Sequence, residues 1–274
     1  MKLLKIILYS GILIILLFIG LFIAWKEKGT LSKFVKPRDI PTTFVEKPIY
    51  KTYKVPILTY HYIEYPTNPD DTIRKGLTVL PSNFEAQIIN LRENEYKFIT
   101  PYDLYLALKG EKEISEKSVI VTFDDGFGDF YTDAYPIIKK YEIPVTVFMV
   151  TGLINQPNYL TYEQIIDILK SGYVEFGSHS WSHKNLTMIS DKELIEEIYN
   201  GKEYFEETYK VKLRYFAYPY GTYNERVEGT VKDAGFILAM SMIGDGTRIH
   251  SLNTLYHLSR LKVGNAQNLI PYIQ

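Results

Sequence analysis

The first side chains that could do chemistry are two adjacent carboxylates, Asp124 and Asp125. They end the apolar, β-branched run Ser118–Phe123, which is typical of a buried strand, and Gly126 follows them. Neighbouring side chains on a regular strand point to opposite faces, so both acids reach one site only if the backbone turns, as Gly126 permits. Two close carboxylates repel each other, and a bound metal ion would relieve the repulsion. These residues alone leave open the alternative of an acidic turn without chemistry.

Two histidines, His179 and His183, follow a second strand-like segment, Tyr173–Gly177. Because the carboxyl ends of parallel strands meet at one edge of a sheet, both imidazoles could converge with Asp125 on one metal ion. Two neutral imidazoles and one carboxylate leave coordination positions open for water and substrate. An isolated pair with this spacing is more often two surface histidines. Its place after the Asp-Asp strand favours the metal site.

A third segment at a strand end, Tyr218-Pro219-Tyr220-Gly221, offers backbone donors. Proline lacks an amide hydrogen, but the amides of Tyr220 and Gly221 could point into a cleft and stabilise a developing oxyanion. A structural turn is the alternative. We therefore take Tyr220 as a candidate catalytic residue, and Pro219 and Gly221 as candidate substrate-binding residues.

The elements that must position these residues alternate along the chain between strand and helix patterns. Thr161 with Gln164, and Ser190 with Glu193, are capping-box starts of two helices. The regular alternation predicts an α/β fold with parallel strands, and the number of strands is closer to a barrel than to a small open sheet. Besides those above, the strand patterns are Val55–Tyr60, Pro144–Met149, Leu213–Tyr218, Gly235–Met240 and Tyr256–Val263.

Three motifs in order give a specific resemblance. Thr122–Gly126, His179–His183 and Phe216–Gly221 resemble the first three motifs of the polysaccharide deacetylases, the family-four carbohydrate esterases. The resemblance implies a distorted, incomplete β/α barrel that removes acetyl groups with one divalent metal ion, usually zinc. It also implies that Asp124 is the general base and that Asp125, His179 and His183 bind the metal.

The general acid is the first point at which the chain departs from the commonest form of the family. In that form the acid is a late histidine in a Leu-x-x-His motif, and neither His250 nor His257 stands in a good copy of it. The early segment Pro56–Ile63 instead resembles a subgroup that includes the poly-N-acetylglucosamine deacetylases, in which an early histidine supplies the acid. We therefore favour His61 over His257, with a packing role for His61 as the alternative.

The base-orienting arginine is the second departure. The position that this arginine occupies in the third motif is Ala217 here. Arg260 could reach the site from the last strand and replace it, although an exposed arginine is the interpretation we favour. Asp245 could belong to a remnant of a fourth motif, but the Gly-Asp-Gly around it is first of all a turn.

The amino-terminal region predicts a membrane anchor. The apolar run from Ile6 to Ala24 is long enough to cross a bilayer as a helix. Lys2 and Lys5 before it, and Trp25 after it, favour a cytoplasmic amino terminus and an extracellular remainder. We thus expect residues 1–25 to be a short cytoplasmic stub and a transmembrane helix, residues 26–53 to be an extended linker, and residues 54–274 to be the catalytic domain. The expected location is the cell membrane, crossed once.

Composition narrows the function further. The chain of 274 residues has no cysteine, which excludes disulfides and thiol catalysis, and its net charge of −1 gives no indication of a nucleic-acid partner. We expect a metal-dependent hydrolase that removes N-acetyl groups from an extracellular or cell-wall polysaccharide containing N-acetylglucosamine. An O-acetyl esterase acting on a glycan such as xylan, and a catalytically weak glycan-binding protein, are the alternatives. A glycosidase is disfavoured because its two carboxyls must lie several ångströms apart across the bond.

Overall fold

The structure of the protein is a computed structural model, and it describes residues 51–68, 70–243 and 248–274. The predicted anchor at residues 1–25, nearly all of the predicted linker at 26–53, and Asp245 lie outside the described residues. Among the residues described, no helix is both long enough and apolar enough to cross a membrane.

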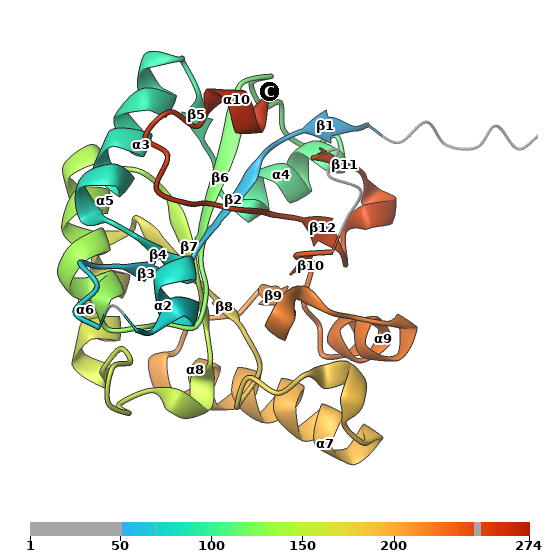
Figure 1. Ribbon diagram of the computed structural model, residues 1–274. Helices are drawn as coiled ribbons and strands as arrows, with labels where there is room; N and C mark the ends of the chain where they lie inside the picture. Colours follow the sequence, from blue (N-terminus) through green and yellow to red (C-terminus); the bar gives the residue numbers. More distant parts are fainter. Residues whose placement is uncertain (1–50, 69, 244–247) are drawn as a thin grey trace, which may run out of the picture. The chain divides into compact units, whose positions relative to one another are not determined.

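A parallel sheet forms the centre of the domain (Figure 1). Its strands are buried on both faces, as in β6, where all six residues are buried. This explains why the strands appear in the sequence as continuous apolar runs. In spatial order the strands are β12 (Leu258–Ser259), β10 (Leu238–Ser241), β9 (Tyr215–Ala217), β8 (Val174–Ser178), β7 (Val145–Met149), β6 (Ser118–Phe123), β2 (Ile57–Tyr60) and β13 (Leu261–Lys262).

The last strand segment nearly closes the sheet into a barrel. β12 and β13 are consecutive pieces of chain separated only by Arg260; β12 pairs with β10 and β13 pairs with β2. One short stretch of chain therefore joins the two edges of the sheet. β8 and β9 pair only at Ser178 and Phe216, so the barrel is irregular there. The prediction of a parallel β/α barrel is confirmed, and the barrel is nearly closed.

Helices cover the outer face of the sheet (Figure 1). Both predicted capping boxes are confirmed: Thr161 caps α6 and Ser190 caps α7, each with reciprocal hydrogen bonds to the residue three positions later. A run of helix from residue 191 to 209 contains the π-helical turn η4 (Glu196–Asn200). The helices are α2 (Thr72–Leu77), α3 (Pro81–Glu93), α4 (Pro101–Leu108), α5 (Tyr135–Tyr141), α6 (Tyr162–Ser171), α7 (Asp191–Ile195), α8 (Gly201–Tyr209), α9 (Glu225–Asp233) and α10 (Ile270–Ile273).

Short elements complete the fold. A second π-helical turn, η1 (Phe130–Ala134), precedes α5, and β5 (Lys97–Phe98) pairs with β6. Two small pairs flank the sheet, β1 (Tyr53–Lys54) with β11 (Ile249–His250), and β3 (Tyr62–Ile63) with β4 (Thr78–Val79). The 3₁₀ turns are η2 (Thr151–Leu153), η3 (Leu186–Met188), η5 (Pro219–Gly221) and η6 (Leu252–Thr254).

Two apolar clusters form the core. The larger one lies between the helices and the sheet, and the smaller one includes Ile57, Ile120, Phe148 and Met240 from alternate positions of the strands. Side chains at alternate positions share one face of a strand, so this second cluster fills the inside of the barrel. Towards the carboxyl ends of the strands the same face turns polar. The residues of β6, which precede the two aspartates, pack into the larger cluster on one face of the sheet and into the smaller cluster on the other.

Candidate active site

Asp124 and Asp125 lie directly after β6 and are both buried. Asp125 has a φ of 70° and Gly126 a φ of 74°, so two consecutive residues in the left-handed region turn the chain away from the strand. Glycine adopts this region without strain, whereas an aspartate there is uncommon. The turn brings both carboxylates to one place, which a continued strand would not do.

Asp125, His179 and His183 form a group that could hold a metal ion. Asp125 Oδ1 lies 3.6 Å from His179 Nε2 and 3.3 Å from His183 Nε2. The buried Asp125 Oδ1 has no hydrogen-bond partner among the described residues, which is costly unless a cation occupies the space in front of it. His179 Nδ1 lies 2.7 Å from the Ala217 carbonyl, and donation to that oxygen leaves Nε2 as the free ligand atom.

The protonation states of these three residues fit a divalent cation. Burial lowers the pKa of His179 to about 3 and also lowers that of His183, so both imidazoles are neutral near pH 7, the form that binds metal. Burial, with the added charge of Asp124, raises the pKa of Asp125 to about 7. A cation at Asp125 would favour its ionised form. The donor set of two nitrogens and one oxygen suits zinc and related transition metals.

The loop that carries both histidines is held by its neighbours. Ser180 and His183 have φ values of 67° and 62°, which side chains rarely adopt. The amides of Thr151 and Gly152 in η2 donate to the carbonyls of Ser180 and Trp181 at 3.2 and 2.8 Å. A Cβ on Gly152 would lie 2.6 Å from the Trp181 carbonyl oxygen, so this approach requires glycine.

Arg260 binds Asp124, and the interpretation of Arg260 as an exposed strand residue is wrong. Its guanidinium donates from Nη1 and Nη2 to the two oxygens of Asp124, each at 2.7 Å, and its side chain is fully buried. Burial alone would raise the pKa of Asp124, but the charge and hydrogen bonds of Arg260, together with the nearby His179 and His61, outweigh it and hold that pKa well below its ordinary range. Arg260 thus contacts Asp124 as expected of the arginine that is missing at Ala217, because the closing strand turns its side chain into the barrel.

His61 follows β2 and lies beside the same carboxylate. Its Nε2 is 4.0 Å from Asp124 Oδ2, and burial lowers its pKa despite the opposing charge of Asp124. His257 instead contacts Glu228 on α9 at 3.1 Å and stacks on Tyr223. Of the two candidates for the general acid, His61 is the one found next to Asp124, and its role stays a prediction.

Tyr220 and Gly221 lie in the 3₁₀ turn η5 after β9. Tyr220 has a φ of 60°, and its largely exposed ring lies 4.7 Å from the His183 ring. The Gly221 amide donates to the Tyr218 carbonyl at 2.8 Å, so the expectation that it points into the cleft is wrong. Pro219 is buried and offers no donor. The Tyr220 amide is the remaining candidate for contact with an oxyanion.

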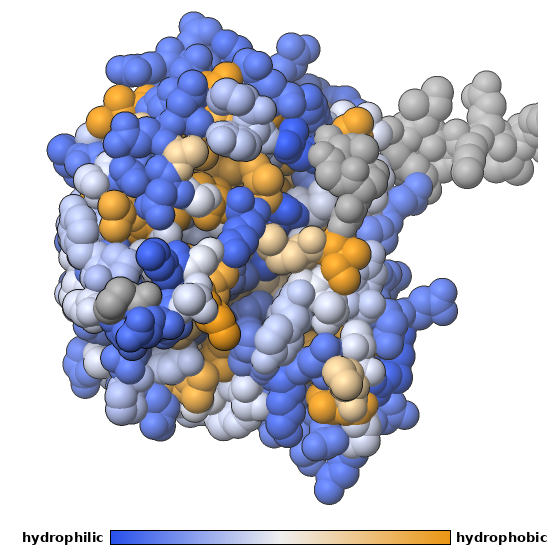
Figure 2. All heavy atoms as spheres, in the orientation of Figure 1, coloured by the Kyte–Doolittle hydropathy of each residue, from blue (hydrophilic) through white to orange (hydrophobic). Residues whose placement is uncertain are grey.

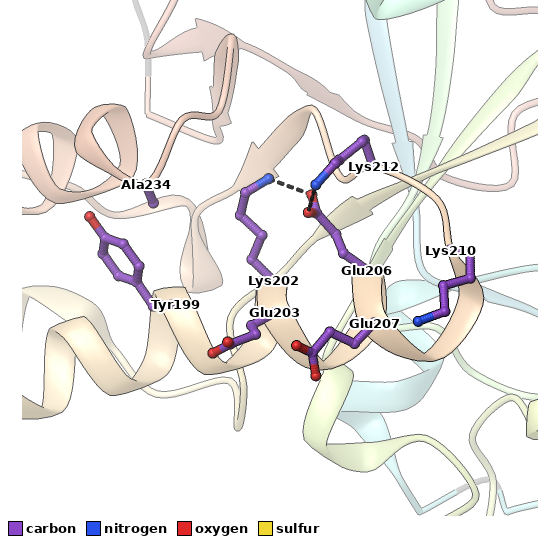
Figure 3. Close-up of a pocket in the computed structure, with 8 residues that line it drawn as sticks. All are labelled: Tyr199, Lys202, Glu203, Glu206, Glu207, Lys210, Lys212 and Ala234. Carbon is purple, nitrogen blue, oxygen red and sulfur yellow. Dashed lines mark hydrogen bonds and ion pairs between the residues drawn. The ribbon is translucent and has the colours of Figure 1, made fainter.

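A hollow of about 460 Å³ on the outer side of α8 contains none of these residues (Figure 3). Lys202 and Lys212 in it both donate to Glu206, each at 2.6 Å. The hollow therefore lies apart from the group of aspartates and histidines, and its lining residues take no part in that group.

Comparison with protein families agrees with the geometry. The family model described as polysaccharide deacetylase matches residues 111–239, a range that contains the carboxylates, both metal-site histidines and the Tyr-Pro-Tyr-Gly turn. The chain carries a polysaccharide deacetylase domain. His61 and Arg260 lie outside the matched range: His61 directly follows β2, and Arg260 lies between β12 and β13, the strands that complete the barrel.

Individual relatives extend the similarity. YxkH of Bacillus subtilis, a candidate polysaccharide deacetylase, is 32% identical over 191 residues, which cover 70% of this chain and 65% of YxkH. A poly-beta-1,6-N-acetyl-D-glucosamine N-deacetylase of Staphylococcus aureus is 30% identical over 181 residues, 61% of this chain and 62% of that protein. The chain thus spans slightly less than two thirds of these curated relatives. The structure of the Streptococcus pyogenes deacetylase PplD in complex with acetate superimposes with a TM-score of 0.74 at 29% identity, covering 82% of this chain and 100% of that one.

Proposed function

We propose that the protein is a metal-dependent hydrolase that removes N-acetyl groups from a polysaccharide containing N-acetylglucosamine. The observation that carries the proposal is the group Asp125, His179 and His183 beside a second carboxylate, Asp124, which Arg260 keeps ionised. The Staphylococcus aureus relative, named for an N-acetylglucosamine polymer, supports this choice of substrate.

The first step needs a base and an electrophile. A divalent ion held by Asp125, His179 and His183, zinc by preference, would supply Lewis acidity to the acetyl carbonyl and lower the pKa of a water molecule. Asp124 takes a proton from the attacking water. Its ion pair with Arg260 helps to hold its pKa well below the ordinary range, so Asp124 is ionised near neutral pH and can act as the base.

The remaining steps use Tyr220 and His61. The Tyr220 amide donates to the oxyanion that develops on the carbonyl oxygen of the acetyl group as water attacks its carbon. His61 donates a proton to the departing sugar nitrogen as the carbon–nitrogen bond breaks, releasing acetate and leaving a free amine on the glycan. Because burial lowers its pKa, protonated His61 gives up its proton readily.

Of the two alternative functions, the structure disfavours the glycan-binding protein more than the O-acetyl esterase. A catalytically weak glycan-binding protein was suggested by the missing arginine at Ala217, and Arg260 removes that reason. An O-acetyl esterase uses the same residues, since ester and amide hydrolysis share the attack step. Acetate release from N-acetylglucosamine oligomers and from acetylated xylan separates the N-deacetylase from the O-acetyl esterase.

The proposed location follows from the sequence. We propose that residues 1–25 anchor the protein in the cell membrane and that the domain faces outward, where an envelope glycan is accessible. The face in Figure 2 carries mainly hydrophilic side chains, with apolar ones in separate groups, as expected for a domain surrounded by water.

The direct test is acetate release from N-acetylglucosamine oligomers and from acetylated xylan. We expect release from the oligomers, its loss on chelation, and its recovery when zinc is added back. Asp124→Asn should bind zinc but lose about 10²–10⁴-fold in kcat, because it removes the base and leaves the ligands in place. Undiminished turnover in a metal-free preparation, or in Asp124→Asn, would contradict the mechanism. Release only from xylan would favour the esterase.

A further inference from the structure

Glu197 is a buried carboxylate that the reaction above does not use. Only 4% of the residue is exposed, although glutamate is rarely buried unless it is paired. It accepts a hydrogen bond from the Ser182 amide at 2.8 Å and another from the Ser182 hydroxyl. Lys184 Nζ lies 3.9 Å away, beyond hydrogen-bond distance, and is half-exposed. Ser182 is therefore the principal partner of this charge.

Ser182 is the residue immediately before the metal-site histidine His183. Both Ser180 and His183 are in the left-handed region, which costs free energy and persists only where the surroundings impose it. The Ser180 end of the loop is held by η2 and by the His183 amide, which donates to Ser180 Oγ at 3.0 Å. Glu197 supplies the corresponding restraint at Ser182.

The helix that carries Glu197 is shaped to reach this loop. Glu197 lies in the π-helical turn η4, and π-helical turns inside α-helices occur frequently at functional sites. One turn later, a Cβ on Gly201 would lie 2.8 Å from Thr151 Oγ1 and 3.3 Å from the Ser180 carbonyl carbon. The absence of a side chain at Gly201 thus allows the helix to approach the loop closely enough for the Glu197 carboxylate to contact it.

The two oxygens of Glu197 each accept one hydrogen bond from Ser182, one from the amide and one from the hydroxyl. A glutamine in its place would keep the size of the side chain but offer only one acceptor oxygen, so it would retain much of the packing and weaken this restraint.

We propose that Glu197 is a positioning residue of the metal site. Through its two hydrogen bonds with Ser182 it fixes the part of the loop that presents His183 to a divalent cation. The proposal rests on the proposed function only in taking Asp125, His179 and His183 as the ligands.

The test is zinc affinity, measured on the full chain by competition with a chromogenic chelator. Glu197→Gln should weaken zinc binding by about 10–100-fold, the range typical for loss of such a partner. The unfolding midpoint of its metal-free form should stay close to that of the wild type, which a purely structural role would not allow. Glu196→Gln is the matched control, since the neighbouring Glu196 is half-exposed and pairs only with Lys192, at 3.8 Å, among described residues.

The outcomes distinguish this proposal from the proposed function. A folded Glu197→Gln protein that binds zinc as tightly as the wild type would overturn the role of Glu197 and leave the enzyme intact. If that variant does not fold, Ser182→Ala decides: it removes the hydroxyl bond, and unchanged zinc affinity would also overturn the proposal. If the wild type itself binds no zinc, the metal site and the proposed function both fail.

Discussion

At the scale of single residues, the ion pair with Arg260 favours the ionised form of Asp124, the residue that we propose as the base. A bidentate guanidinium–carboxylate pair is geometrically specific. Both partners are buried, so water cannot take over the hydrogen bonds that either one makes. A buried ion pair of this kind adds little net free energy of folding, but removing one partner destabilises the fold strongly because the other charge is left buried and unpaired. The pair therefore links the pH dependence of activity to that of unfolding.

Arg260→Met should leave Asp124 buried without a partner and destabilise the fold by about 3–5 kcal/mol at neutral pH. The pKa of Asp124 should rise, so the acidic limb of kcat/KM should move to higher pH, since the base must be ionised. In the wild type this stabilisation is present above the unfolded aspartate pKa of about 3.9 and is lost only as pH falls through the lowered folded pKa. Urea unfolding and pH–rate profiles measure both effects. An unmoved acidic limb in Arg260→Met, or in Arg260→Lys if Met prevents folding, would contradict the assignment.

His61 and His257 provide a matched pair of substitutions. His61→Asn should lower kcat/KM by about 10²–10⁴-fold without changing metal content, since His61 is not a ligand of the Asp125 group. Because a general acid must be protonated and burial lowers the pKa of His61, the alkaline fall of wild-type kcat/KM should begin below the ordinary histidine value of about 6.5. His257→Asn should keep wild-type kinetics, and the reverse pattern would make His257 the acid.

At the scale of elements, most of what positions the site could be predicted from local patterns. The strand before Asp124, the strand before His179 and the capping boxes at Thr161 and Ser190 all follow from periodicity and capping, which are local. The sequence predicts Arg260 within the last strand segment, as found, but predicts an exposed side chain where the structure has a buried one. Which face is buried depends on closure between β10 and β2, which are far apart in sequence, and no local pattern encodes it.

The turn η5 gives a prediction at this scale. Gly221 has a φ of 69°, and a Cβ there would lie 2.6 Å from the Met242 backbone nitrogen. Gly221→Ala should therefore cost more than about 2 kcal/mol and lower kcat, because the strained turn carries the Tyr220 amide. Gly229 inside α9 has open space around its Cβ position, so Gly229→Ala should stabilise the protein by about 0.5–1 kcal/mol. Thermal unfolding compares the two, and equal effects would refute the account of the turn.

At the scale of the whole molecule, the site depends on residues from nearly the full length of the domain. His61 directly follows β2, near the start of the domain, and Arg260 lies between β12 and β13, near its end. The aspartates and the metal-site histidines lie between these two positions in the sequence. The placement of the central motifs was predictable because each motif follows its own strand. Glu197 was not, because a π-helical turn changes the helix register and leaves no recognisable sequence pattern.

The last prediction concerns the separation of anchor and catalysis. Residues from Tyr50 to Gln274 cluster as one compact unit, and every candidate site residue lies within it. Removing residues 1–49 should thus leave the unfolding midpoint and the kcat/KM for soluble oligomers within about twofold of the full chain, since contacts within a domain supply its stability. The same truncation should move the protein from the membrane fraction to the soluble fraction. Continued membrane association after truncation would refute the anchor, and loss of activity on soluble oligomers would show that residues 1–49 contribute to the domain itself.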